Sequence, residues 1–270
     1  MRETRSAADP WLGGKAPHVP ARIGELPSVC LLPGDPARVG MVAEVLDDFV
    51  LLGENREFRL GVGTLHDQKI AVCSTGIGGP SSEIAVVELS RLGVDTFIRV
   101  GGMGAMRADI APGVLTRAAL ALRDGRTSRL YTNDDEDIPS HPDVDAALDA
   151  AAVELGHTLT PISVMSCDSY YIGEGRPLPG LEEVARRRLD EVIARGADAM
   201  DMECETIFAV ARALNRRYGA ILATHGNRVT DGWLEDYEPI QKQLLSVACS
   251  AAAVLSRDGF AGQPPSTQSS

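Results

Sequence analysis

The sequence predicts a single-domain α/β fold with three layers (α/β/α), in which helices cover both faces of a mixed, largely parallel central sheet. Short runs rich in Val, Ile and Leu alternate with stretches of helical periodicity along the 270 residues. This alternation is typical of a sheet whose parallel strands are joined by helices. Two glycine-rich turns, at 33–38 and 74–81, each follow an apolar run directly, as loops at the carboxyl ends of parallel strands do.

The expected elements follow from local composition and spacing. Clusters of β-branched and aliphatic residues predict strands at 29–32, 70–73, 96–100, 114–122, 162–167 and 220–224. Apolar residues three and four positions apart predict helices at 36–45, 81–92, 144–155, 181–195, 203–214 and 240–255. The strand at 96–100 is followed by the glycine-rich segment 101–105.

The length fits one large domain with a well-buried core. We expect this domain to span residues 17–257. Residues 1–16 and 258–270 have the Gly, Pro and Ser content of termini without fixed contacts, and we expect them to be flexible tails.

The net charge of −12 opposes binding to nucleic acid or to an anionic membrane, because such binding depends on neutralisation by Lys and Arg. No apolar run reaches the roughly 18 residues of a membrane span, and the N-terminus lacks the apolar core of a secretory signal. The 5 cysteines are scattered without metal-ligand spacing. They are typical of reduced, buried thiols in a cytoplasmic protein.

The two glycine-rich turns predict an anion site. Backbone N–H groups approach an oxyanion closely where no Cβ intrudes, and a helix that begins just after the loop adds its dipole. Arg38, Arg56 and Arg99 supply local positive charge in an acidic chain, which indicates a small anionic substrate. We also expect Asp35 to pair with Arg38 at the start of a helix. Taken alone, either loop could be an ordinary tight turn.

Several segments resemble the hexameric nucleoside phosphorylases, most closely the uridine phosphorylase type. The segments PGDPARV (33–39), REF (56–58), CSTGIGGPS (73–81) and RVG (99–101) occur in family order, and DMECE (201–205) is similar to the ribose-binding segment. The resemblance runs from about residue 18 to 255. It implies cleavage of a nucleoside by inorganic phosphate, a co-substrate, to give free base and ribose 1-phosphate with no metal or organic cofactor.

The resemblance also implies a phosphate site. Gly34, Arg38 and Arg99 would hold phosphate, and Arg56 would reach in from a neighbouring subunit. Gly102 stands where the family has a Thr or Ser hydroxyl that touches phosphate and ribose. Arginines around a dianion make sense because the phosphate must be desolvated and aimed at the C1′ atom of the sugar.

For the sugar, the resemblance implies Met202, Glu203 and His18 as ribose-binding residues. Glu203 would accept hydrogen bonds from the 2′- and 3′-hydroxyls. Its negative charge would also favour the positively charged, oxocarbenium-like sugar of the transition state. His18 would reach across to the nucleoside of the adjacent subunit.

For the base, the resemblance implies Tyr170, Glu174, Arg176 and Arg228. Arg176 would donate to O4 of a pyrimidine as negative charge develops on the leaving base, so Arg176, Glu203 and Arg99 are the expected catalytic residues. Glu174 departs from the glutamine of uridine phosphorylases, because an ionised carboxylate cannot donate to O2. Either its pKa is raised, or the base is not uracil; guanine, hypoxanthine and a modified pyrimidine are candidates.

The family likeness extends to assembly. Glu57, the Ile77 carbonyl and Ser81 match residues that bind potassium between two subunits, although an interface salt bridge of Glu57 is an equal alternative. If Arg56 and His18 act across an interface, the active unit is at least a dimer, and the resemblance implies a trimer of dimers.

Other classes of protein fit less well. A nucleosidase of the same fold would use water and would lack the phosphate arginines, whereas a nucleoside-binding or catalytically weakened paralogue stays open because of Gly102 and Glu174. A dinucleotide-binding protein is disfavoured, since 101–104 lacks the G-x-G-x-x-G order. The leading expectation is phosphorolysis of uridine or a related pyrimidine nucleoside in pyrimidine salvage, with inosine or guanosine as the alternative.

Overall fold

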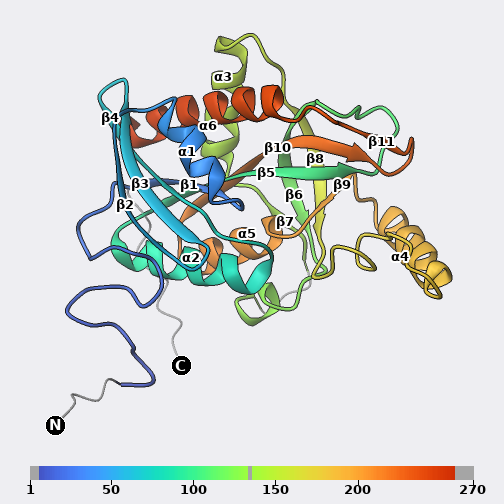
Figure 1. The fold of residues 1–270 in the computed structure, drawn as a ribbon, viewed down its shortest axis with the longest axis horizontal. Coiled ribbons are helices and arrows are strands. Elements are labelled where there is room, and N and C mark those ends of the chain that lie inside the picture. The colour runs from blue at the N-terminus through green and yellow to red at the C-terminus, as the bar shows by residue number, and fades with distance from the viewer. Residues whose placement is uncertain (1–5, 133–135, 259–270) are drawn as a thin grey trace.

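The computed structural model describes residues 6–132 and 136–258, in which strands and helices alternate (Figure 1). The strands are β1 (Val29–Pro33), β2 (Asp47–Asn55), β3 (Phe58–Leu65), β4 (Gln68–Cys73), β5 (Thr96–Ala105), β6 (Leu115–Leu122), β7 (Ile138–Pro139), β8 (Thr160–Ser166), β9 (Ala199–Asp201), β10 (Arg217–Asn227) and β11 (Gly232–Trp233). The helices are α1 (Ala37–Ala43), α2 (Gly79–Leu92), α3 (Pro142–Glu154), α4 (Glu182–Ala194), α5 (Cys204–Ala213) and α6 (Glu238–Asp258), with a short 3-10 turn, η1 (Ser128–Leu130).

The sheet is mixed, and its central strands are parallel. Strands β4, β1, β5 and β10 pair in parallel, and antiparallel partners extend them through β3 and β2 at one edge and β11 at the other. Strand β5 also pairs with β9, and β9, β8, β6 and β10 follow one another back to β5. These five strands therefore close into a ring, which brings the carboxyl ends of β5 and β10 close to β9.

Helices cover both faces of the sheet. Successive side chains of a strand point to opposite faces, and β1 feeds two separate cores in this way. Cys30 and Leu32 join the apolar cluster beneath α2 and α5. Val29 and Leu31 join the cluster beneath α1, α3 and α6. Figure 1 shows α1 and α6 on one side of the sheet and α2 and α5 on the other, so the three-layer prediction is confirmed.

All predicted strands and helices are present, with shifts of a few residues at their ends. The strand predicted at 96–100 is longer in the structure, because residues 101–105 continue β5 and pair with 222–227 of β10. The β2–β3 hairpin was not predicted, since most β2 side chains are exposed and leave no clear alternation.

The segment expected to be a flexible N-terminal tail makes contacts where it is described. Asp9 forms an ion pair with Arg91 of α2 at 2.8 Å, and the Arg91 guanidinium lies 4.2 Å from the ring centroid of Trp11. Its flexibility stays a prediction. At the other end α6 includes Asp258, and the remainder of the predicted C-terminal tail, 259–270, lies outside the described residues.

All 5 cysteines lie within the described part of the chain, where they are buried and form no disulfide. Burial raises the pKa of the Cys249 thiol to about 12. Among residues 6–132 and 136–258, no helix has both the length and the apolar character to cross a membrane.

The contact between β10 and α3 gives a test of the core packing. A Cβ added to Gly219 would lie 2.5 Å from Val144 Cγ1, and Val144 is fully buried. Because overpacking forces neighbours to move, Gly219→Ala should lower the free energy of unfolding by about 1–3 kcal/mol in urea denaturation. Adding Val144→Ala to this variant should recover part of the overpacking cost.

Gly40→Ala is the matched control. No atom lies within 4 Å of a Cβ at Gly40, which is inside α1. This change should be neutral or slightly stabilising, because alanine favours a helix over glycine. If Gly219→Ala were as stable as Gly40→Ala, the close approach of α3 to β10 would be contradicted.

Candidate active site

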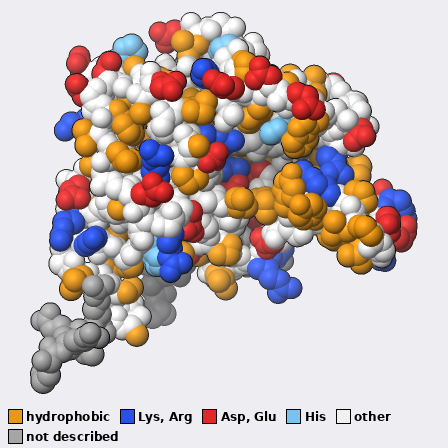
Figure 2. Space-filling model, viewed as in Figure 1, with side chains coloured by type: hydrophobic (Ala, Val, Ile, Leu, Met, Phe, Trp, Pro, Cys, Tyr) orange, Lys and Arg blue, Asp and Glu red, His pale blue; other side chains and the backbone are white. Residues whose placement is uncertain are grey.

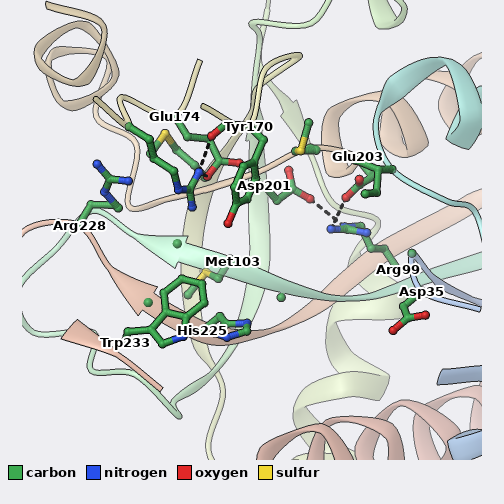
Figure 3. A pocket seen from close by; sticks show the side chains of 18 of the residues that line it. Asp35, Arg99, Met103, Tyr170, Glu174, Asp201, Glu203, His225, Arg228 and Trp233 are labelled. Carbon is green, nitrogen blue, oxygen red and sulfur yellow. Dashed lines mark hydrogen bonds and ion pairs between the residues drawn. The ribbon is translucent and has the colours of Figure 1, made fainter. Parts of the chain in front are cut away.

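A cavity of about 950 Å³ opens at the carboxyl ends of β1, β4, β5 and β10. Figure 2 shows the hollow on this face, with basic and acidic side chains meeting in it. In Figure 3, Glu174, Tyr170 and Arg228 lie at one end and Arg99 and Glu203 at the other. With the exception of Arg56, the base and phosphate residues predicted from sequence thus line one cavity, with Glu174 and Arg99 at opposite ends.

Arg99 is held between two carboxylates. Its Nε donates to Asp201 Oδ2 at 2.8 Å, and its Nη2 forms an ion pair with Glu203 (Figure 3). The Arg99 side chain is only 4% exposed. Burial alone would lower the pKa of the guanidinium, but Glu203 and Asp201 more than reverse this, and the pKa is raised. Arg99 therefore stays charged at the cavity wall.

Asp201 was not predicted as a site residue, although it begins the DMECE segment. Its Oδ1 accepts a hydrogen bond from the Ser166 hydroxyl at 2.5 Å, and its Oδ2 accepts from the Cys204 N–H at 3.0 Å. The carboxylate thus satisfies an N–H at the start of α5 while it fixes Arg99. The signal was an acidic residue two positions before the predicted ribose ligand.

Glu203 lies immediately before α5 and reaches the second glycine-rich turn. Its Oε1 accepts from the Gly78 N–H at 2.7 Å. Gly78 has a φ of 90°, a conformation that favours glycine. Burial raises the pKa of Glu203, and the Arg99 charge opposes this rise. Arg99, Glu203 and the turn that begins α2 therefore form one connected unit.

The two glycine-rich turns lie side by side, as predicted for halves of one anion cradle. The Gly76 N–H donates to the Gly34 carbonyl at 2.9 Å, and a Cβ at Gly34 would lie 3.1 Å from the Gly76 oxygen. Because no side chain intrudes, the backbone of both turns is accessible at the cavity wall.

The ion pair predicted between Asp35 and Arg38 is not formed among the described residues. Asp35 accepts instead from the Ala37 N–H at 2.8 Å, which caps the start of α1. Arg38 Nε donates to Gln241 Oε1 of α6 at 2.8 Å, and its Nη1 donates to the Val100 carbonyl at 3.4 Å. Arg38 is thus oriented toward the cavity by α6 rather than by its own turn.

The base end combines a buried acid with two arginines. Glu174 is 4% exposed and forms an ion pair with Arg176. The Arg176 guanidinium lies 3.8 Å from the Tyr170 ring centroid, and Arg228 donates to the Gly175 carbonyl at 3.0 Å. Burial raises the pKa of Glu174, and Arg176 counteracts the rise.

Aromatic rings on the opposite wall were missed by the sequence analysis. His225 of β10 lies 4.1 Å from the Trp233 ring centroid, at an interplanar angle of 37° (Figure 3). On its other side His225 stacks on Tyr237 at 4.2 Å and 13°. A lone histidine in an apolar strand was a signal for His225. Trp233 had no comparable signal in the sequence, because the short β10–β11 hairpin was not predicted.

Met202, Gly102, Glu57, Ile77 and Ser81 also line the cavity. The Ser81 hydroxyl donates to Glu57 Oε1 at 3.1 Å, so two of the three residues predicted to bind potassium are in contact.

His18 and Arg56 do not line the cavity of their own subunit. His18 is held by Glu88 at 2.6 Å from its Nδ1. Arg56 is exposed in the β2–β3 turn with a φ of 54°.

Comparison with known proteins identifies the family. Residues 28–257 match the model of the phosphorylase superfamily, and the chain belongs to this family. It is 35% identical to a uridine phosphorylase of Thermococcus kodakarensis over 240 residues, which cover 88% of this chain and 86% of that protein. It is also 34% identical to a guanosine phosphorylase of Halorubrum lacusprofundi over 221 residues, 80% of this chain and 85% of that one.

A solved structure agrees with the fold. The crystal structure of a purine nucleoside phosphorylase from Toxoplasma gondii, in complex with immucillin-H, superimposes with a TM-score of 0.80. The sequence identity is 25%, and the match covers 91% of this chain and 98% of the other.

The buried pairing of Arg99 generates a stability prediction. Asp201→Ala should lower the free energy of unfolding by about 3 kcal/mol or more, because it leaves a buried cation with one partner and removes the cap of α5. Urea denaturation followed by circular dichroism measures this.

Asp109→Ala is the control, because Asp109 pairs with Arg107 at the surface, where its side chain is 66% exposed. Solvent screening makes such a pair weak, so no measurable change is expected. Equal effects of the two substitutions would contradict the structural role of Asp201.

Proposed function

We propose that this protein is a nucleoside phosphorylase, a pentosyltransferase that moves the sugar of a nucleoside from its base to inorganic phosphate. The observation that carries the proposal is the cavity with a glycine-and-arginine cradle and Glu203 at one end and a Glu174–Arg176 pair at the other. The uridine and guanosine phosphorylases among its relatives support this assignment.

Phosphate would bind between Gly34, Arg38 and Arg99, next to Gly102. Arg38 and Arg99 supply a fork geometry that matches phosphate oxygens, and the backbone of the glycine-rich turns adds N–H donors. The buried carboxylates beside Arg99 keep its orientation fixed before phosphate arrives. Such preorganisation aims the nucleophile without loss of binding energy.

The ribose would lie over Met202 and Glu203. In the reaction, the C1′–N bond breaks with its electron pair leaving on the base, and a C1′–O bond forms to phosphate. Glu203 accepts hydrogen bonds from the ribose hydroxyls, and its negative charge stabilises the positive sugar of the transition state. Arg176 donates to the base as that base becomes negative. These steps require no organic cofactor.

A second subunit would complete the site. His18 and Arg56 lie outside the cavity of their own chain, which is compatible with a role in the site of a neighbour. The β2 strand that precedes Arg56 exposes three large apolar side chains, Val50, Leu51 and Leu52, at 58%, 46% and 39%, which a neighbouring subunit would cover. We therefore expect at least a dimer, and a hexamer built from three dimers, in the cytoplasm.

The proposed potassium site is at the same interface. Glu57, the Ile77 carbonyl and Ser81 offer only oxygen ligands, and the contact between Ser81 and Glu57 fits a shared monovalent cation. The ion would hold the two subunits together and take no part in bond breaking.

Base choice depends on Glu174. Uridine or a related pyrimidine nucleoside in pyrimidine salvage is the leading substrate, because a uridine phosphorylase is among the relatives reported above and Arg176 and Arg228 match the uridine phosphorylase type. A 6-oxopurine nucleoside is the second candidate. The N1–H and the 2-amino group of guanine are adjacent donors that a carboxylate accepts, and a guanosine phosphorylase is among the relatives.

The assignment of function is tested by base release. Uridine, thymidine, cytidine, inosine, guanosine and adenosine should be assayed by absorbance, each with and without phosphate. At least one should be cleaved only when phosphate is present. Cleavage of the same extent without phosphate would indicate a hydrolase and contradict the proposal.

Arg38→Ala tests the phosphate end. The phosphate KM should rise about 10- to 100-fold, the range expected when a hydrogen bond to a charged group is lost. The nucleoside KM should change little. Arg91→Ala, a surface substitution in α2, is the control and should change neither KM. If Arg38→Ala raised the phosphate KM and the nucleoside KM equally, Arg38 would not be a phosphate ligand.

The pH dependence of base choice tests Glu174. Its raised pKa means that the carboxylate takes up a proton at a higher pH than an ordinary glutamate. Guanosine needs the ionised form, so the ratio of kcat/KM for guanosine to that for uridine should fall as the pH drops through this pKa. Glu203 acts on both substrates and cancels in the ratio.

In Glu174→Gln the ratio should be independent of pH, and uridine turnover should increase. A ratio that keeps its wild-type pH dependence in this variant would show that another group reads the base.

A further inference from the structure

A tyrosine hydroxyl lies just behind Gly102, a residue of the cavity wall, at the place where a side chain of position 102 would begin. A Cβ added to Gly102 would lie 2.9 Å from the Tyr237 hydroxyl oxygen and 3.6 Å from Tyr237 Cζ. Gly102 lines the cavity from β5, and its φ is not in the left-handed region. Glycine is therefore required at position 102 by the tyrosine beside it, not by its backbone conformation.

Tyr237 is held firmly in this position. It immediately precedes α6 and is 9% exposed. Its ring stacks on His225, with centroids 4.2 Å apart and planes at 13°. One turn further along α6, Gln241 holds Arg38, and the Gln241 N–H donates to the Tyr237 carbonyl at 3.1 Å. The start of α6 thus positions both Tyr237 and an arginine of the cradle.

Within the described residues 6–132 and 136–258, the Tyr237 hydroxyl donates only a weak hydrogen bond, to the Ala223 carbonyl. Burial raises the pKa of Tyr237, and the nearby charges of Arg38 and Arg99 oppose but do not cancel this rise. The phenol is therefore neutral. Its contact with the Ala223 carbonyl is long, at 3.4 Å, compared with the usual 2.7–2.8 Å of an O–H···O hydrogen bond.

We propose that the Tyr237 hydroxyl is a phosphate ligand, which donates a hydrogen bond to a phosphate oxygen in place of the hydroxyl that position 102 lacks. This inference rests on the proposed function, because it takes the anion between Arg38 and Arg99 to be inorganic phosphate. A hydrogen bond from a neutral hydroxyl to a phosphate oxygen is charge-assisted and short. Position 102 and Tyr237 are then alternative sources of one hydroxyl, because a side chain at position 102 and the Tyr237 hydroxyl would occupy the same space.

Steady-state kinetics with phosphate as the varied substrate tests the proposal. Tyr237→Phe keeps the ring and its stacking on His225 but removes the hydroxyl. The phosphate KM should rise about tenfold or more, with the nucleoside KM within about twofold of wild type. Tyr218→Phe is the matched control. Tyr218 is 7% exposed and belongs to the apolar cluster beneath α2 and α5, on the face of the sheet opposite Tyr237, with its ring centroid 5.1 Å from that of Phe208.

The reciprocal substitution separates a ligand from a packing residue. Gly102→Ser alone should weaken phosphate binding, because its Cβ collides with the Tyr237 hydroxyl. In Gly102→Ser/Tyr237→Phe the space is free and a hydroxyl is restored. The phosphate KM of the double variant should therefore be lower than that of Tyr237→Phe alone. If the phosphate KM of the double variant were equal to or higher than that of Tyr237→Phe, the proposal that Tyr237 supplies the hydroxyl missing at position 102 would be overturned.

A binding measurement distinguishes this proposal from the proposed function. The rise in Tm that inorganic phosphate causes, without nucleoside, should be smaller in Tyr237→Phe than in wild type, whereas the two Tm values without phosphate should agree. If wild type cleaves no nucleoside but this difference is found, the proposed function is wrong and the phosphate ligand stands. If the variant keeps the wild-type phosphate response in Tm, or the wild-type phosphate KM, Tyr237 is not a ligand.

Discussion

The buried interaction of Arg99 with Asp201 and Glu203 is the constraint on which the site depends. A guanidinium that is 4% exposed must be paired, because an unpaired buried charge costs several kcal/mol. Pairing it with two carboxylates fixes β5, the end of β9 and the start of α5 relative to one another. Glu203 also bonds to Gly78, so the second glycine-rich turn is part of the same unit. The proposed phosphate cradle and the proposed sugar site are therefore parts of one connected set of interactions.

The topology explains why this unit is at the cavity. Parallel pairing of β4, β1, β5 and β10 places the loops that follow them at one edge of the sheet, where ligands bind in α/β folds. The ring closed by β9 then brings Asp201 to the end of β5. From the other face, α6 contributes Gln241 to Arg38 and places Tyr237 behind Gly102. Two helical layers thus act on one anion site.

The sequence was sufficient to predict the three-layer fold, because β1 and the other central strands are short apolar runs bounded by turns. Arg38, Arg99, Glu174 and Glu203 could be predicted because they stand in ordered motifs. The carboxyl end of β5 was not predicted, since the glycines at 101–105 hide a strand that is maintained by pairing with β10. Contacts between segments far apart in the chain gave no local signal, and Asp201, His225 and Tyr237 have roles that depend on them.

The central claim is that phosphate, not water, receives the sugar. Phosphorus NMR of a reaction with inorganic phosphate and the nucleoside that is cleaved fastest tests it most directly. The account predicts that a pentose 1-phosphate resonance grows as inorganic phosphate declines, in a ratio of one to one with the free base released. Release of base with an unchanged phosphate resonance and free pentose would contradict it, because the arginine cradle would then have no part in the chemistry.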